Sequence, residues 1–146
     1  MKLTVEKIPG ITDIEINIRH DHDEEVASIV AMLNHQTTII GKKGERNYPL
    51  NPSDIYYFES VDEKVFAYDK TDIYQIKERL YELESLLSTF GFSRVSISVI
   101  VNRRLIDHFK SSLNGRIEAK LSNGETIIVS RNYVKDLKAA LGGDRK

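Results

Sequence analysis

The sequence predicts a mainly β protein, α+β overall, built from short antiparallel strands that hairpins connect. Three observations support this class. Short runs rich in β-branched and aromatic residues recur between polar turns. The dipeptides Asn114-Gly115 and Asn123-Gly124 suit the positive φ angles of tight hairpin turns. Apolar residues at helical spacing occur in only a few segments, so helices are expected to be a minority.

Residues 1–40 are expected to form a small strand-strand-helix region. The segments "MKLTVEKI" and "TDIEINIRH" alternate apolar and polar residues, which is typical of half-buried strands. The next segment, "DHDEEVASIVAMLNHQ", has an acidic first turn that suits the dipole of a helix N-terminus. It places apolar residues on one helical face, at Val26, Ile29, Val30 and Leu33. This acidic, amphipathic region is the expected surface for oligomerisation or regulation.

Two hairpins are expected next. From Thr37, "TTII", the turn "GKKGE" and "RNYPL" indicate a first hairpin, which Pro49 and "NPSD" close. "DIYYFES" and "VFAY" indicate a second hairpin around the polar tip "VDEK". The following "DIYQI" could be a strand or the start of a helix, because an apolar stripe at helical spacing runs through Ile76, Leu80, Leu83 and Leu87. A strand that hands over to an inserted helix near Lys77 is the arrangement we expect.

The C-terminal part is expected to add further hairpins and one terminal helix. After Gly91, the segments "FSRVSISVIVN", "LIDHF", "RIEAKL" and "TIIVS" read as strands. Ser130 can cap the helix that follows, and Gly142-Gly143 can end it. The apolar face of this helix would consist of Tyr133, Val134, Leu137 and Leu141.

Composition excludes several classes of protein. The chain has 146 residues and no Cys, so it has no disulfide framework, thiolate zinc site or thiol nucleophile. No apolar run approaches the length of a membrane span, and "MKLTVEKIPG" lacks the apolar core of a secretory signal. We therefore expect a soluble cytoplasmic protein.

The net charge of −1 hides a strong asymmetry. Residues 1–91 carry 10 Lys and Arg against 17 Asp and Glu, whereas residues 92–146 carry 11 against 5. The basic part could bind a polyanion, and nucleic acid is the commonest candidate because clustered basic residues release its counterions. Attraction between the two parts, within one chain or across a dimer, explains the charge equally well.

Three motifs contain residue types found in metal, hydrolase or phosphate-binding sites, but we do not interpret any of them as such a site. Acids in "HDHDEE" suit a helix N-terminus, which we favour over a metal site. Asp107, His108, Ser111 and Ser112 include the residue types of a hydrolase, but no "GxSxG" elbow surrounds either serine. "GKKGE" lacks the spacing of a phosphate-binding loop. We expect no enzyme activity, cofactor, metal or small-molecule substrate.

Three motifs in the C-terminal two thirds are similar to a known family. They are "D-I-x-Y-F-E-S", "R-V-S-x-S-x-I-V-N" and "N-G-x-x-I-I-V-S-R", and they occur in this order from about Gly41 to Leu141. In these motifs the chain resembles the LytTR-type DNA-binding domain of bacterial transcription regulators. The resemblance implies a LytTR-like core of short antiparallel sheets over residues 41–142, with residues 143–146 as a tail. Without a receiver domain in front, the chain is similar to stand-alone members, which are often encoded beside a small membrane protein that restrains them.

The resemblance also implies which residues contact duplex DNA. Loops enter successive major grooves, the first at the hairpin tip from Val61 to Lys64, the second after Arg94 and the third at Ser130. The implied contact residues are Lys64, Arg94, Ser96, Ile97, Ser98, Asn102, Arg103, Arg104, Ser130, Arg131 and Asn132. Each has a structural alternative, such as a turn lysine at Lys64, a scaffold ion pair at Arg94 or a helix cap at Ser130.

The chain departs from the family pattern at several of these positions. Ile97 stands where relatives usually carry a basic or amide side chain, so it can touch a thymine methyl but cannot donate a hydrogen bond to a base. Asn132 replaces a frequent second Arg, which would direct that contact to adenine or remove it. Arg103 and Arg104 add charge that is unusual in the family and could compensate through phosphates.

The function that this sequence predicts is sequence-specific regulation of transcription on double-stranded DNA. The protein is expected to act as a homodimer or as paired protomers on repeated half-sites. Two other classes remain open. A module for single strands or RNA would show exposed aromatics among the basic residues, whereas Phe92, Phe109 and Tyr133 fit core positions better. A protein-interaction adaptor would use the charge asymmetry for self-association and would show no salt-dependent affinity for duplex DNA.

Overall fold

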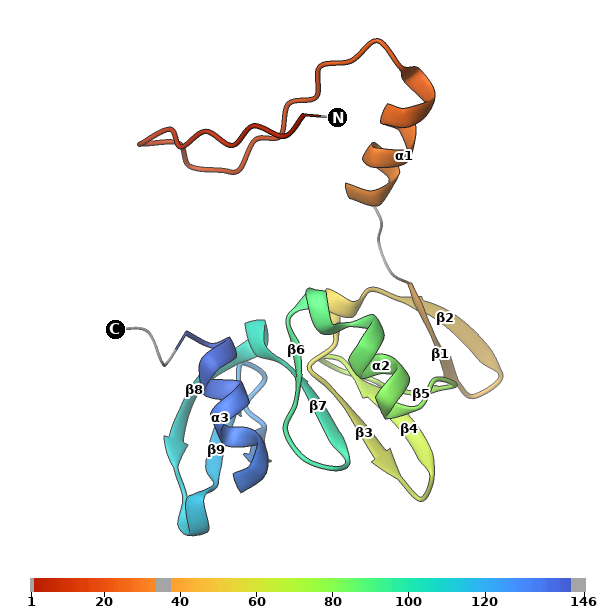
Figure 1. Ribbon diagram of the computed structural model, residues 1–146. Helices are drawn as coiled ribbons and strands as arrows, with labels where there is room; N and C mark the ends of the chain where they lie inside the picture. Colours follow the sequence, from red (N-terminus) through yellow and green to blue (C-terminus); the bar gives the residue numbers. More distant parts are fainter. Residues whose placement is uncertain (1, 34–37, 143–146) are drawn as a thin grey trace. The chain divides into compact units, whose positions relative to one another are not determined.

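The structure is a computed structural model that describes residues 2–33 and 38–142 (Figure 1). The chain divides into two compact units, residues 1–35 and residues 36–146.

The N-terminal unit contains a single helix among its described residues, α1, Asp23–Leu33. Its acidic first turn is where the sequence predicted it. Val26 and Ile29 are half-buried, and Val30 is exposed. The side chain of Leu33, and the last part of the predicted helix at residues 34–36, lie outside the described residues.

The two strands predicted before this helix are wrong, because residues 2–20 form no strand. An alternating pattern stabilises a strand only where a neighbouring strand and a packed surface receive its apolar face, and an isolated hairpin is marginal in water. Here Leu3 is 84% exposed, and Val5 and Ile14 are each 87% exposed. The N-terminal region is therefore an extended segment followed by a helix.

The larger unit contains a seven-stranded antiparallel sheet (Figure 1). The order of its strands across the sheet is β2-β1-β5-β4-β3-β7-β6. Both predicted hairpins are confirmed, since β1 pairs with β2 and β3 pairs with β4. The strands are β1 Ile39–Lys43, β2 Arg46–Leu50, β3 Tyr57–Val61, β4 Lys64–Tyr68, β5 Ile73–Ile76, β6 Phe92–Arg94 and β7 Val99–Asn102.

One face of this sheet packs against the inserted helix α2, Leu80–Leu86. The predicted change from strand to helix is confirmed, with the helix beginning at Leu80 rather than near Lys77. Arg79 occupies the N-cap position, and its backbone N–H donates to the carboxylate of Glu82 at 3.1 Å. The fully buried side chains of Phe58, Leu83 and Ile100 belong to the resulting core cluster.

A second sheet and the terminal helix complete the larger unit. The strands β8 Ile106–Ser111, β9 Ile117–Leu121 and β10 Thr126–Val129 form an antiparallel sheet in the order β10-β9-β8. Helix α3, Arg131–Ala140, buries Leu137 in a cluster that also contains Tyr57 and Val101 of the first sheet. This second cluster holds the two sheets together. Short 3-10 turns lie in the connections, at η1 Pro52–Asp54, η2 Ser88–Phe90, η3 Arg103–Leu105 and η4 Leu113–Gly115.

The predicted mainly β fold class is thus confirmed. Ser130 stands at the N-cap position of α3 as expected, but its side chain makes no capping hydrogen bond. Among the helices formed by the described residues, none is long and apolar enough to cross a membrane.

Candidate nucleic-acid interface

Backbone hydrogen bonds bring the three predicted contact loops together at one end of the larger unit. The N–H of Ser60 donates to the carbonyl oxygen of Ser98 at 2.8 Å, which joins the first loop to the second. The N–H of Ser130 donates to the carbonyl oxygen of Val95 at 2.8 Å, which joins the second loop to the third. We call residues 61–64, 95–98 and 130–132 the loop edge; it lies on the lower side of the unit in Figure 1.

The first loop is a tight turn with an acidic tip. Asp62 and Glu63 have φ angles of 51° and 65°, the left-handed conformation that a two-residue hairpin turn requires. Both side chains and that of Lys64 are exposed. The only basic group in this loop therefore stands beside two carboxylates, which repel phosphate.

A stacked pair of tyrosines lies in the strands that carry this loop. The rings of Tyr57 and Tyr68 are 4.3 Å apart and 12° from parallel. The hydroxyl of Tyr68 donates to the carboxylate of Glu59 at 3.0 Å. Burial, with the hydrogen bond and the charge of Glu59, raises the pKa of Tyr68 to about 12. The strands that carry the first loop are thus fixed by side-chain packing as well as by their backbone pairing.

Arg94 is part of the protein scaffold in this structure. Its Nε donates to the carbonyl oxygen of Ser96 at 2.8 Å, one terminal nitrogen donates to that of Ile97, and the other meets the carboxylate of Glu84 at 3.1 Å. The Arg94 side chain is only 18% exposed. Because each of the three nitrogens has a partner inside the protein, this structure supports a scaffold role for Arg94 rather than the DNA contact that the resemblance implied. The ion pair that was its alternative is present.

The second loop projects Ile97 into solvent. Ile97 is 81% exposed, whereas Ser96 and Ser98 on either side are half-buried. The hydroxyl of Ser96 accepts a hydrogen bond from the N–H of Ser98 at 3.2 Å. The serines therefore shape the loop, and the isoleucine forms its outermost surface.

The third loop is the beginning of α3. Arg131 and Asn132 are exposed, and Ser130 is half-buried. The positive end of the helix dipole lies here, next to a guanidinium group, so this part of the loop edge favours an anion. The Cγ and Cδ atoms of Arg131 lie against Gly115 of the turn between β8 and β9. The sequence marked this glycine only as a hairpin residue.

Asn102, Arg103 and Arg104 do not belong to the loop edge. The pairing of Glu59 with Val99 and of Tyr57 with Val101 directs the end of β7, with these three residues, away from the β3–β4 tip. The three residues follow the second loop closely in the sequence. However, β7 runs from that loop to the opposite end of the sheet, where these residues lie. Their implied contact with the same DNA surface is therefore not supported.

The side chains of Asn102 and Arg103 have structural partners instead. Asn102 is 1% exposed, donates from its amide to the carbonyl oxygen of Ile55 at 3.0 Å, and accepts from the N–H of Arg104 at 3.1 Å. A terminal nitrogen of Arg103 donates to the carbonyl oxygen of Phe92 at 2.8 Å, and burial lowers the pKa of Arg103. This burial gives Asn102 a structural role and does not support the DNA contact that the resemblance implied for it.

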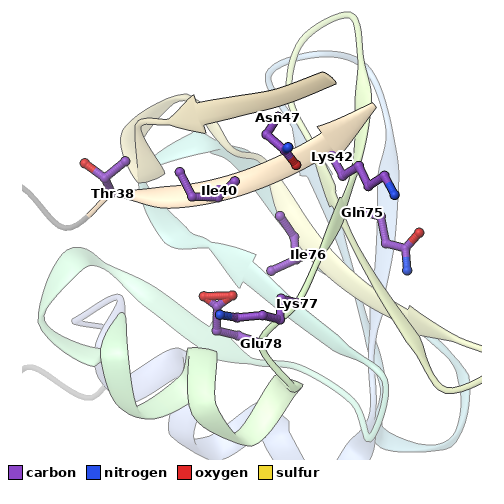
Figure 2. A pocket seen from close by; sticks show the side chains of 8 residues that line it. All are labelled: Thr38, Ile40, Lys42, Asn47, Gln75, Ile76, Lys77 and Glu78. Atoms are coloured by element: carbon purple, nitrogen blue, oxygen red, sulfur yellow. The ribbon is translucent and has the colours of Figure 1, made fainter. Parts of the chain in front are cut away.

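A shallow pocket of about 480 Å³ lies elsewhere on the larger unit, over β1, β2 and β5 (Figure 2). Ile40, Lys42, Gln75 and Lys77 are among the residues that line it. None of the predicted contact residues lines this pocket, so the pocket is separate from the loop edge.

Comparisons with known proteins agree with these features. Residues 45–142 match the LytTr DNA-binding domain family. HTH-type transcriptional regulators of Staphylococcus aureus strains MSSA476 and COL are 31% and 30% identical to the chain over 129 residues, which is 88% of this chain and 87% of theirs. The LytTr DNA-binding domain of a methyl-accepting/DNA response regulator from Bacillus cereus has a TM-score of 0.70 and 26% identity, covering 74% of this chain and 99% of that one.

The arrangement of helices distinguishes this chain from the helix-turn-helix class that the names of the staphylococcal relatives mention. That motif needs two helices joined by a short turn, the second of which enters the major groove. In the described part of the chain, strands separate α1 from α2 and α2 from α3. The match over residues 45–142, the fold and the three ordered motifs agree, and the chain belongs to the LytTR family of DNA-binding domains.

Proposed function

We propose that the protein is a sequence-specific transcription regulator that binds double-stranded DNA and reads its major grooves through the loop edge. The observation that carries this proposal is the pair of backbone bonds, Ser60 to Ser98 and Val95 to Ser130, which fasten loops from three chain segments onto rigid strands. Readout of bases requires side chains held at fixed spacings, and loops anchored in this way meet that requirement.

The exposed side chains of the loop edge divide into two roles. Arg131 is suited to a bidentate contact with guanine, Asn132 to adenine, and Ile97 to a thymine methyl. Lys64 and the first turn of α3 are suited to phosphates, which set the register of the protein on the duplex. Ser96, Ser98 and Ser130 contribute polar atoms at the margin of the surface.

Composition favours duplex over single-stranded nucleic acid. Residues 61–64, 95–98 and 130–132 include no aromatic side chain, whereas single-strand binders stack bases on exposed aromatic rings. Tyr133, the nearest aromatic residue in the sequence, packs against the second core cluster.

The proposed setting is the bacterial cytoplasm, and no enzyme activity is part of it. The regulator acts as a homodimer on paired half-sites, and residues 1–40 contact the second protomer or a small membrane protein that restrains it. The exposed apolar side chains of Leu3, Val5 and Ile14 support a role of this region in protein contacts. Light scattering tests the dimer: the wild-type chain should have twice the monomer mass, and Ile29→Asp should lower it.

The main proposal is tested with a duplex that the wild-type chain selects from a randomised pool. The affinity of the protein for this duplex should fall steeply with salt concentration. It should also exceed the affinity for a scrambled duplex by about 10³-fold or more. Single-stranded DNA and RNA of the same sequence should compete poorly. No enrichment in the selection, a flat salt response or equal competition by single strands would contradict the proposal.

A further inference from the structure

A fourth loop reaches the same end of the larger unit as the loop edge. In the second sheet, Ile117 pairs with Ser111 on one side and with Val129 on the other. The turn between β8 and β9, residues 112–116, therefore leaves the sheet at the end where β10 passes into Ser130 and α3. No residue of this turn was among the contacts that the family resemblance implies.

This turn is in direct contact with Arg131. A Cβ atom on Gly115 would lie 3.2 Å from both Cγ and Cδ of Arg131, which is closer than ordinary van der Waals contact. Gly115 also has a φ of 76°, which glycine adopts without strain. The absence of a side chain at this position allows the aliphatic part of Arg131 to lie flat on the turn.

The turn is closed by its own backbone and presents its side chains outward. The N–H of Ser112 donates to the carbonyl oxygen of Arg116 at 2.9 Å, and the N–H of Arg116 donates to that of Leu113 at 3.3 Å. Leu113 is 81% exposed, and Asn114 and Arg116 are also exposed. A single exposed leucine needs no explanation. However, Leu113 and Ile97 are the most exposed large apolar side chains of residues 38–142, and both lie in loops that adjoin the third loop.

We propose that the β8–β9 turn is a fourth DNA-contacting element, in which Arg116 neutralises a backbone phosphate beside the groove that Arg131 enters and Leu113 packs against the adjoining sugar or thymine methyl. This inference rests on the proposed function and extends the same surface. The ligand is duplex DNA, because the turn joins a cationic side chain and an apolar one to a surface already suited to base and phosphate contacts.

Arg116→Gln tests the phosphate contact, with Arg46→Gln as the matched control. Arg46 is an exposed arginine in β2, which four strands separate from β7 in the first sheet. On both the selected and the scrambled duplex, Arg116→Gln should weaken binding and reduce the slope of log K against log salt by about one unit. Arg46→Gln should leave the slope unchanged. Arg116→Lys should keep the wild-type slope, because it retains the charge.

Leu113→Ala tests the apolar contact, with Ile73→Ala as its control. Ile73 is 53% exposed and pairs with Tyr68, at the end of β4 opposite the Lys64 tip. Leu113→Ala should weaken binding of the selected duplex by about fivefold to tenfold at an unchanged salt slope, because it removes apolar contact area and no charge. Ile73→Ala should bind as the wild type does.

The outcomes separate this inference from the proposed function. If the wild-type chain selects and binds duplex DNA while Arg116→Gln and Leu113→Ala behave like their controls, the fourth element is refuted and the function stands. If the wild-type chain binds no duplex, both are refuted. Hydroxyl-radical footprinting gives an independent reading, because Arg116→Gln should lose protection at sugars next to those that depend on Arg131. An unchanged footprint would overturn the assignment.

Discussion

The backbone N–H of Ser130 donates to the carbonyl oxygen of Val95 at 2.8 Å, and this bond joins the start of helix α3 to the loop that carries Ile97. The two segments are 35 residues apart in the sequence, because Val95 follows β6 of the first sheet and Ser130 follows β10 of the second. Since the bond lies between main-chain atoms, it does not depend on which side chains stand at positions 95 and 130.

Arg131→Ala should reduce both affinity and discrimination. If the guanidinium binds a base edge, its removal should cost about 1–3 kcal/mol on the selected duplex and relax the preference at one base pair. Binding measurements on single-base variants of the selected duplex check this. Because Arg131 is exposed, the melting temperature should stay near the wild-type value. Equal weakening on selected and scrambled DNA would make Arg131 a phosphate contact.

Arg94→Ala should impair readout without removing a phosphate contact. The side chain holds the carbonyl groups of Ser96 and Ile97, so its loss should loosen the second loop and lower discrimination between selected and scrambled duplexes. The salt slope should not change. Amide hydrogen exchange of Ile97 and Ser98 should become faster.

Glu84→Gln is the matched control for Arg94. It removes only the half-exposed ion pair, so the free energy of unfolding should change by about 0–1 kcal/mol. Loop exchange and discrimination should remain near wild type. A lower salt slope in Arg94→Ala would instead indicate a direct phosphate contact.

Neutralising the acidic tip of the first loop should strengthen binding to any duplex. Asp62→Asn and Glu63→Gln each remove a negative charge beside Lys64, and the gain should be about twofold to fivefold at low salt. Asn tolerates the positive φ at residue 62, so the turn should persist. Glu45→Gln in the β1–β2 turn is the control. If all three substitutions have the same effect, only net charge matters and the tip does not approach DNA.

Arg103 and Arg104 should differ from the loop-edge residues. Arg104→Gln should leave the salt slope of DNA binding unchanged, because its side chain lies across Gly91 at the other end of β7. Arg103→Ala should lower the free energy of unfolding by about 1–3 kcal/mol, since it removes a charged donor from the carbonyl oxygen of Phe92. Urea titrations and salt-dependent binding assays measure the two effects. A reduced slope in Arg104→Gln would extend the interface to this end.

Stability should fall in alkaline solution, in part through Tyr68. Its pKa is raised to about 12 from an ordinary value of 10.0, so the folded state favours the neutral phenol. This contribution is fully present below pH 10.0 and is lost as the pH rises toward 12. In Tyr68→Phe the side chain at this position cannot ionise. The midpoint of urea unfolding should therefore decline less between pH 9 and pH 11 in this variant than in the wild type. The measurements are made in about 0.15 M salt. Identical declines would contradict this role.

The sequence predicted the hairpins of the larger unit well because their signals are local. Turn residues and β-branched runs located β1 to β4 and placed both Asn-Gly dipeptides in hairpin connections, although each connection is longer than a two-residue turn. The same reasoning failed for residues 2–20, where the alternation is present but a partner strand is missing. Whether a strand forms depends on its neighbours, and a period of two does not reveal them.

The roles of arginines were the least predictable part of the candidate site. Arg94 and Arg131 look alike in the sequence, but one donates to two carbonyl groups of its own loop and the other is exposed. Arg103 and Arg104 follow the second motif closely in the sequence, but they lie at the end of β7 that is opposite the loop edge. The contact between Gly115 and Arg131 joins the β8–β9 turn to the first residue of α3, which no local sequence pattern records.

The bond from the Ser60 N–H to the Ser98 carbonyl has a consequence for the evolution of operators. Main-chain atoms are the same in every residue type except proline, so substitutions at exposed positions such as Ile97 and Asn132 leave the fastening intact. Descendants of one ancestral regulator can therefore acquire new target sequences one side chain at a time, without a loss of folding that would need compensation. Ile97, at 81% exposed, is one side chain that can change in this way.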